Sequence, residues 1–66
     1  MVASLPIDQK SIVRAATEMI REYGPEAEAT ARQHSKELRV EGFEPVAKTW
    51  DRISEAIKDM QEAPGA

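Results

Sequence analysis

The sequence predicts an all-α protein, a compact three-helix bundle, from two observations. Apolar residues recur at every third or fourth position through most of the chain, which is the spacing of amphipathic helices and not the alternation of strands. Breaks that contain glycine and proline divide this pattern into segments. We expect a single domain over residues 1–66, with disordered ends at 1–5 and 62–66. The helices are expected at about 7–23, 25–41 and 45–61.

The first predicted helix has a strong apolar stripe and clear limits. Pro6 and Asp8 both serve as start signals, so the helix is expected to begin between residues 6 and 9. Gly24-Pro25 ends it, because glycine suits the left-handed position after a helix and proline suits the first turn of the next one. The stripe consists of Ile12, Ala15, Ala16, Met19, Ile20 and Tyr23.

The second predicted helix is the thinnest, because few large apolar residues share a side of it. Small side chains let backbones approach closely, so we expect this helix to lie tightly against the other two. Glu26 and Glu28 place negative charge where its first N–H groups are free, and Gly42 ends it. The predicted inward stripe is Ala27, Ala31, His34 and Leu38.

The third predicted helix starts at Pro45, with Glu44 as its cap. Its apolar stripe is Val46, Trp50, Ile53, Ile57 and Met60. Trp50, like Tyr23, is expected to anchor the core, and Phe43 to do the same. Contact with a partner is the alternative, because large exposed apolar residues mark interaction sites. The candidate partner-binding residues are Phe43, Trp50 and Met60.

His34, the chain's one histidine, occupies a slot where an apolar residue is expected. The simplest interpretation is an amphipathic filler, whose ring packs while one nitrogen reaches a backbone carbonyl or water. A pH-sensitive contact at a helix or subunit interface is a second interpretation. Catalysis is the third and weakest, because no Ser or Cys is placed to form a nucleophile–base pair.

The composition excludes several classes of protein. Charged residues make up 32% of the chain and apolar residues 41%, a balance typical of folded proteins. Because there is no cysteine and a single histidine, we expect no disulfide, no metal and no cofactor. No apolar run exceeds three residues, so we expect no membrane span, no signal peptide and a cytoplasmic location. A domain this small buries only ~60% of its unfolded surface, which leaves self-association as a source of stability.

Basic residues form two stripes on a chain of net charge −3. If the first two helices present these stripes side by side, they make a patch for phosphates or for an acidic partner. The alternative is a solvated face balanced by pairs such as Arg14 with Glu18 and Glu28 with Arg32. The second helix also begins Pro-Glu-Ala-Glu, which would repel phosphate. The stripes consist of Lys10, Arg14 and Arg21, and of Arg32, Lys36 and Arg39.

A set of small and apolar positions suggests a relationship: Tyr23-Gly24-Pro25-Glu26-Ala27, Ala31, Glu41-Gly42, Trp50, Ile53 and Ala56-Ile57. Over roughly residues 10–60 this spacing resembles that of short, mostly alphaproteobacterial helical proteins of unknown function. The resemblance implies an uncharacterised helical family and transfers no functional residue. Leu38, Gly42 and Ala47 also match the tetratricopeptide hairpin, but a single unit cannot bury its own faces, so we do not infer a repeat.

The sequence therefore favours a non-enzymatic protein–protein interaction module, acting as a homodimer or as the small subunit of a complex. We expect no enzyme activity and no small-molecule substrate. The alternative is a small nucleic-acid-associated regulator that uses the basic residues of the first two helices.

Overall fold

The protein is all-α in the part that the structure, a computed structural model, describes, which is residues 8–62. No strand occurs among these residues, and they form a small helical bundle, which confirms the predicted class. The disorder predicted for 1–5 and 63–66 lies outside the described residues, whereas Glu62 belongs to a helix. The elements are α1 (Gln9–Tyr23), the 3₁₀ turn η1 (Gly24–Glu26), α2 (Ala27–Val40) and α3 (Glu44–Glu62).

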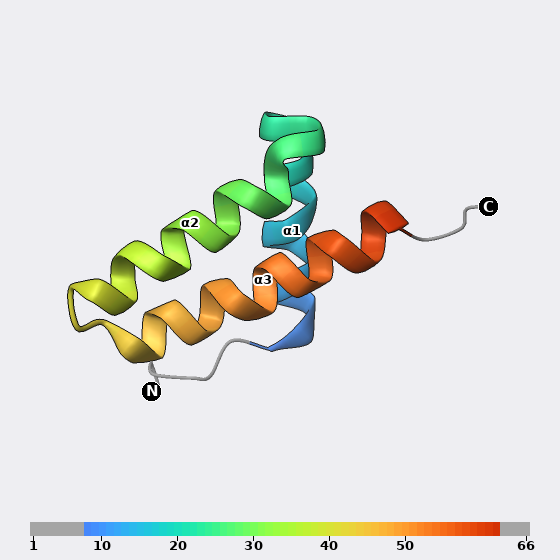
Figure 1. Ribbon diagram of the computed structural model, residues 1–66. Coiled ribbons are helices and arrows are strands. Elements are labelled where there is room, and N and C mark those ends of the chain that lie inside the picture. Colours follow the sequence, from blue (N-terminus) through green and yellow to red (C-terminus); the bar gives the residue numbers. More distant parts are fainter. Residues whose placement is uncertain (1–7, 63–66) are drawn as a thin grey trace.

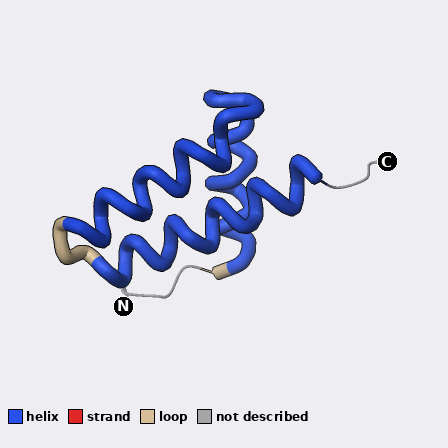
Figure 2. Tube along the Cα trace, viewed as in Figure 1, coloured by secondary structure: helices blue, strands red, loops and turns tan. Residues whose placement is uncertain are grey.

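The helices α2 and α3 form an antiparallel hairpin, and α1 packs across one side of it (Figure 1). The crossing lies toward the end of the hairpin where α2 begins, so the closed end, at residues 41–43, extends past α1. Nearly all of the described chain is helical, with the turn at 41–43 as the main exception (Figure 2). One half of the hairpin therefore has a helix against it, and the other half does not.

The ends of α1 are set by Asp8 and Gly24. The Asp8 carboxylate accepts a hydrogen bond from the Ser11 backbone N–H at 2.9 Å, which caps the helix. This bond stabilises the charged form and therefore lowers the pKa of Asp8. At the other end Gly24 has φ 57°, a conformation that favours glycine, and its N–H donates to the Ile20 carbonyl oxygen. The predicted break at residue 24 is confirmed.

The turn between α2 and α3 is a Schellman motif centred on Gly42. The Phe43 N–H donates to the Leu38 carbonyl oxygen at 2.8 Å, and the Gly42 N–H donates to that of Arg39 at 3.1 Å. Gly42 adopts φ 91°, which an L-residue with a side chain disfavours. Glu44, predicted as the cap of α3, is instead its first residue, and the Phe43 carbonyl accepts the Ala47 N–H at 2.9 Å.

The core lies where the three helices meet. Trp50 packs against this core while remaining half-buried, whereas Tyr23, also predicted as a core anchor, is 45% exposed. Tyr23 is the last residue of α1, at the η1 turn, where less of the hairpin is left to cover it. The centres of the predicted α1 and α3 stripes meet against the alanine side of α2, whereas Val46 and Met60, also predicted in the α3 stripe, are 46% and 39% exposed. The core cluster consists of Ile12, Ala16, Met19, Ala27, Ala31, Ile53 and Ile57.

The inward side of α2 differs from the predicted stripe at two positions, His34 and Leu38. Ala27 and Ala31 are fully buried as expected, but the next inward residue is Ser35, which is only 2% exposed. His34 and Leu38, predicted to continue the stripe, are half-buried beside it. Small residues four positions apart let α2 approach α3 closely, and the buried hydroxyl needs a hydrogen-bond partner there.

Candidate interaction surface

On the side of the hairpin where α1 packs, the closed end extends beyond α1 and exposes a group of apolar and aromatic side chains. Phe43 is 52% exposed and Val46 is 46% exposed, values that are high for large apolar residues beside a core. Val46 and Trp50 lie one turn apart on α3, and His34 and Leu38 lie one turn apart on α2. We call this group the tip surface: His34, Leu38, Phe43, Val46 and Trp50.

His34 and Trp50 join the two helices of the tip surface. Their ring centroids are 4.9 Å apart, with the ring planes tilted by 48°. The imidazole therefore packs against the indole at a tilt, as expected for the ring of an amphipathic filler. Of the two partners predicted for a ring nitrogen, a backbone carbonyl or water, no described backbone carbonyl accepts such a hydrogen bond. Both rings are half-buried, so each can meet a molecule that binds at this surface.

Phe43 owes its position to the Schellman motif. The hydrogen bond from its N–H to the Leu38 carbonyl brings residue 43 back beside the last turn of α2. An apolar contact between these two positions commonly accompanies this motif. The turn thus holds an aromatic ring at the edge of the molecule without burying it.

A polar cluster on the opposite side of the hairpin holds the closed end together. We call it the polar clamp: Ser35, Arg39, Glu44 and Asp51. The Ser35 hydroxyl lies 3.1 Å from the Ala47 carbonyl oxygen and also bonds the Asp51 carboxylate. Since the hydroxyl has one proton, it donates to one of these two acceptors at a time.

Arg39 forms the outer part of the polar clamp. Its Nη2 donates to Asp51 at 2.9 Å, and its Nε donates to Glu44 at 3.1 and 3.2 Å. The Ser35 and Arg39 hydrogen bonds hold the pKa of the Asp51 carboxyl below its usual range. Hydrogen bonds to Asp51 and Glu44 raise the pKa of Arg39. Both carboxylates and the guanidinium are partly solvated, so these pairs fix geometry more than they add stability.

The polar clamp was not predicted from the sequence. Ser35 continues the four-residue spacing of Ala27 and Ala31, and that spacing of small residues could have placed it at the helix contact. Its pairing with Asp51 depends on the register between α2 and α3, for which the sequence carries no comparable signal.

The structure does not bring all the predicted partner-binding residues together. Phe43 and Trp50 belong to the tip surface, whereas Met60 lies near the other end of α3 and is exposed there. Val40, which was not predicted, is the most exposed of the large apolar residues within 8–62. It lies on the polar clamp side, where it lines a hollow with Arg32, Lys36 and Arg39.

The two basic stripes occupy different parts of the surface. Lys10 and Arg14 line a hollow formed by residues of α1 alone. Arg32, Lys36 and Arg39 line a second hollow, on the polar clamp side of the hairpin. Glu28 neutralises Arg32 at 2.7 Å, as predicted. Glu18, predicted to pair with Arg14, pairs with Arg21 at 3.3 Å instead. The nucleic-acid alternative stays a prediction, without a single assembled patch to favour it.

No match to this chain is found among protein-family models, curated proteins or solved structures. The resemblance to short helical proteins therefore stays a prediction.

Two further observations concern the described residues alone. No helix among them has both the length and the apolar character that crossing a membrane requires. No group of three or more His, Cys, Asp or Glu side chains is gathered among them in an arrangement that could hold a metal ion.

Proposed function

We propose that this compact three-helix bundle is a non-enzymatic, cytoplasmic protein-interaction module, and that it binds its partner through the tip surface. The observation that carries the proposal is the exposure of Phe43 and Val46 on the half of the hairpin that α1 does not cover, next to the half-buried Trp50 at the border of the core. Burial of apolar surface contributes about 25 cal/mol per Å², so covering these side chains favours association.

The chemistry of the tip surface suits a protein partner. Aromatic side chains supply large contact areas with few rotatable bonds, and they are enriched where binding energy is concentrated. The Schellman motif fixes the backbone of Phe43, and a ring contact with His34 holds Trp50. The surface is therefore largely organised before a partner arrives, which reduces the entropy lost on binding.

The buried hydroxyl supports binding over catalysis. Ser35 is already bonded to a carbonyl oxygen and a carboxylate, and it is closed off from solvent between two helices. A nucleophilic serine needs an adjacent base and access to substrate. The polar clamp instead acts as the support that keeps the two helices of the tip surface in register.

The test compares two exposed aromatic residues. Phe43→Gln removes an aromatic from the tip surface, and Tyr23→Gln removes one of similar exposure from the end of α1. Circular dichroism establishes that both variants keep the wild-type helical content. We expect tagged wild-type protein and Tyr23→Gln to capture the same partner from the native cell, or to self-associate equally. Phe43→Gln should lose this binding by about tenfold or more.

The proposal is contradicted if Phe43→Gln binds as well as Tyr23→Gln does. It is also contradicted if the wild-type protein captures nothing above an unrelated tagged control and is a monomer as well.

A further inference from the structure

We infer that the partner on the tip surface is a second copy of this chain, and that the tip surface of each copy covers the outer face of α1 in the other. This inference rests on the proposed function, because it names the occupant of the same surface. A two-fold axis would repeat the contact twice, which is the commonest arrangement of homodimers.

The outline of the molecule permits this arrangement. The helix α1 stands on one side of the hairpin and covers one half of it. Trp50 packs against the core cluster that α1 shares with Ile53 and Ile57, and Val46 lies one turn from Trp50, so the tip surface continues along this same side toward the closed end. Two copies that face each other can place each α1 over the tip surface of its partner. The result is two hairpins with the two α1 helices side by side between them. In this arrangement the outer face of α1 is the surface that contacts the tip surface of the partner.

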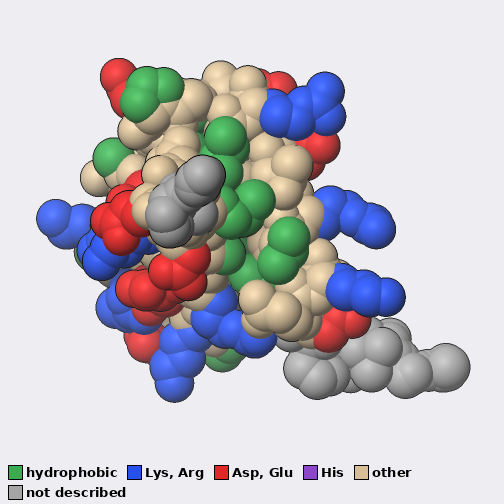
Figure 3. All heavy atoms as spheres, turned by 90° about the vertical axis from the view of Figure 1, so that its right-hand side faces the viewer, with side chains coloured by type: hydrophobic (Ala, Val, Ile, Leu, Met, Phe, Trp, Pro, Cys, Tyr) green, Lys and Arg blue, Asp and Glu red, His purple; other side chains and the backbone are tan. Residues whose placement is uncertain are grey.

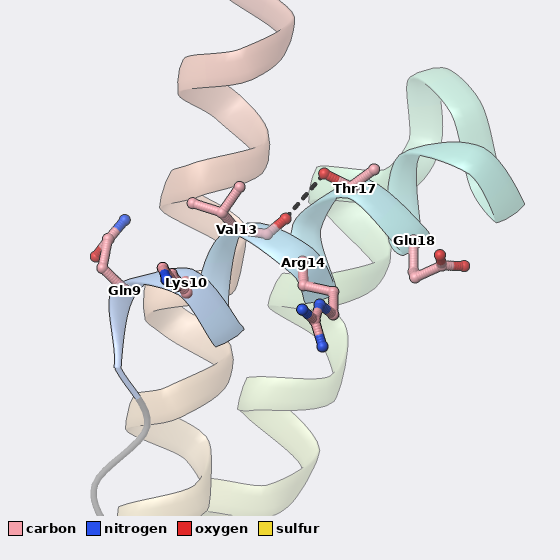
Figure 4. Close-up of a pocket in the computed structure, with 6 residues that line it drawn as sticks. All are labelled: Gln9, Lys10, Val13, Arg14, Thr17 and Glu18. Carbon is pink, nitrogen blue, oxygen red and sulfur yellow. Dashed lines mark hydrogen bonds between the residues drawn. The ribbon is translucent and has the colours of Figure 1, made fainter.

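The outer face of α1 has an apolar centre. It forms a shallow hollow of about 470 Å³, and Val13 is 40% exposed within it. The Thr17 hydroxyl donates to the Val13 carbonyl oxygen at 2.9 Å, so its hydrogen bond is satisfied within the helix (Figure 4). The lining residues are Gln9, Lys10, Val13, Arg14, Thr17 and Glu18.

The charges at this hollow that form no ion pair with a described residue are basic, because Glu18, which also lines it, is paired with Arg21. Lys and Arg side chains follow the outer edge of α1, beside a strip of apolar side chains (Figure 3). Arg21 is paired with Glu18, but Lys10 and Arg14 form no ion pair with any described residue. Two cations therefore remain available to a partner at this face.

The charges beside the tip surface are acidic. Glu37 lies on α2 three residues after His34, and Glu41 directly follows the helix, with its N–H donating to the Glu37 carbonyl oxygen at 3.1 Å. Both therefore lie on the His34 side of α2. Both are exposed, and neither pairs with a cation in the described part of the chain. In the dimer, the tip surface with its acidic margin faces the outer face of α1 with its basic margin. Opposite charges that meet across an interface in this way help to specify the partner.

A contact between two tip surfaces that brings the two α2 helices together is less favourable. It would place Glu37 and Glu41 of one copy against the same residues of the other, and like charges across an interface are repulsive. The same complementarity that selects α1 as the opposing surface therefore disfavours this packing.

The experiment measures the monomer–dimer equilibrium of the full chain by sedimentation over about 1 µM to 1 mM protein. The variants are Arg14→Glu and Glu41→Arg, singly and together. Lys48→Glu and Glu62→Arg are matched controls, because they reverse the same charges at exposed positions of α3 outside both faces. Circular dichroism confirms that each variant folds.

We expect the wild-type protein and both controls to dimerise with similar dissociation constants. Each single reversal should raise the dissociation constant by about tenfold, because it replaces an attraction between opposite charges with a repulsion and the contact occurs twice. The dissociation constant of the double variant should return to within about threefold of the wild-type value. In that variant positions 14 and 41 again carry opposite charges, with the signs exchanged.

Three results would overturn the inference. The first is a wild-type protein that stays monomeric up to 1 mM. The second is a dimer that neither Arg14→Glu nor Glu41→Arg weakens. The third is a double variant as weak as the single ones, which would show that these two residues do not face each other. In all three cases the proposed function still stands if another protein is captured in a manner that depends on Phe43.

Discussion

At the scale of single residues, the closed end of the hairpin depends on side chains that are small or absent. Gly42 supplies a positive φ, and Ser35 supplies a hydroxyl that fits between two closely packed helices. Neither residue contributes much apolar area. Their effect is to fix the direction in which α3 leaves α2, and hence the position of Phe43 and Val46.

Gly42 should be sensitive to the addition of a side chain. Its φ of 91° strains an L-residue, while no atom lies close enough to clash with a Cβ. Gly42→Ala should therefore lower the free energy of unfolding by about 1–2 kcal/mol through backbone strain alone. Gly42→Asn is the matched control and should lose less, because asparagine tolerates this region better. Urea denaturation measures both, and an alanine variant as stable as the wild-type protein would refute the assignment.

At the scale of elements, α2 is the helix whose inward side is made of small residues. Ala27, Ala31 and Ser35 bury little area themselves, yet they let the larger residues of α1 and α3 approach. The helix α2 is therefore held mainly by close packing against α1 and α3, and less by the burial of its own apolar side chains.

Enlarging one of these side chains should separate the helices. Ala31→Leu places a bulky group at a fully buried position and should cost about 1–3 kcal/mol of unfolding free energy. Ala29→Leu, at an exposed position of the same helix, should change it by less than about 0.5 kcal/mol. Thermal or urea unfolding distinguishes them. Equal stability of the two variants would mean that α2 does not pack through Ala31.

At the scale of the whole molecule, the core lies where α1 crosses the hairpin, and a polar cluster holds the part beyond it. The stability of the folded state depends on pH, because an ionised carboxylate stabilises the start of α1 and another stabilises the polar clamp. The pKa of Asp8 is lowered by the hydrogen bond from Ser11, and that of Asp51 by Ser35 and Arg39. A carboxyl whose pKa is lowered on folding contributes stability at higher pH and loses it as the pH falls through that pKa.

The free energy of unfolding should therefore fall as the pH is lowered below about 4, where unfolded aspartates take up protons. Asp51→Asn should reduce this fall, because the variant carries one fewer carboxylate to protonate in the polar clamp. Glu62→Gln is the control, since it removes a carboxylate at an exposed site outside the clamp. Urea unfolding at pH 2.5 to 7 measures the dependence. A wild-type curve that does not fall, or an unchanged slope in Asp51→Asn, contradicts the assignment.

The sequence predicted the helices well because their signals are local. The apolar period, the break at Gly24-Pro25 and the stop at Gly42 each depend on residues close together in the chain, and the structure places helix ends within two residues of them. Tyr23 was misplaced because its burial depends on how far the hairpin extends beneath the end of α1. That length is a property of the assembled molecule.

The candidate site was predicted only in part for the same reason. Phe43 and Trp50 were predicted to anchor the core, with partner contact as the alternative; Trp50 does pack against the core, whereas Phe43 is 52% exposed. His34 became Trp50's neighbour only through the register of the hairpin. The Ser35–Asp51 pair depends on that register too. Periodicity identifies which residues share one helix face, and it does not determine which residue on another helix lies opposite.

The contact between His34 and Trp50 also gives the protein a built-in optical probe. Trp50 is the chain's one tryptophan, so its ultraviolet emission comes from a single, half-hydrated indole. Whatever excludes water from that ring shifts the emission to shorter wavelength. Occupancy of this end of the molecule can therefore be followed in unlabelled protein.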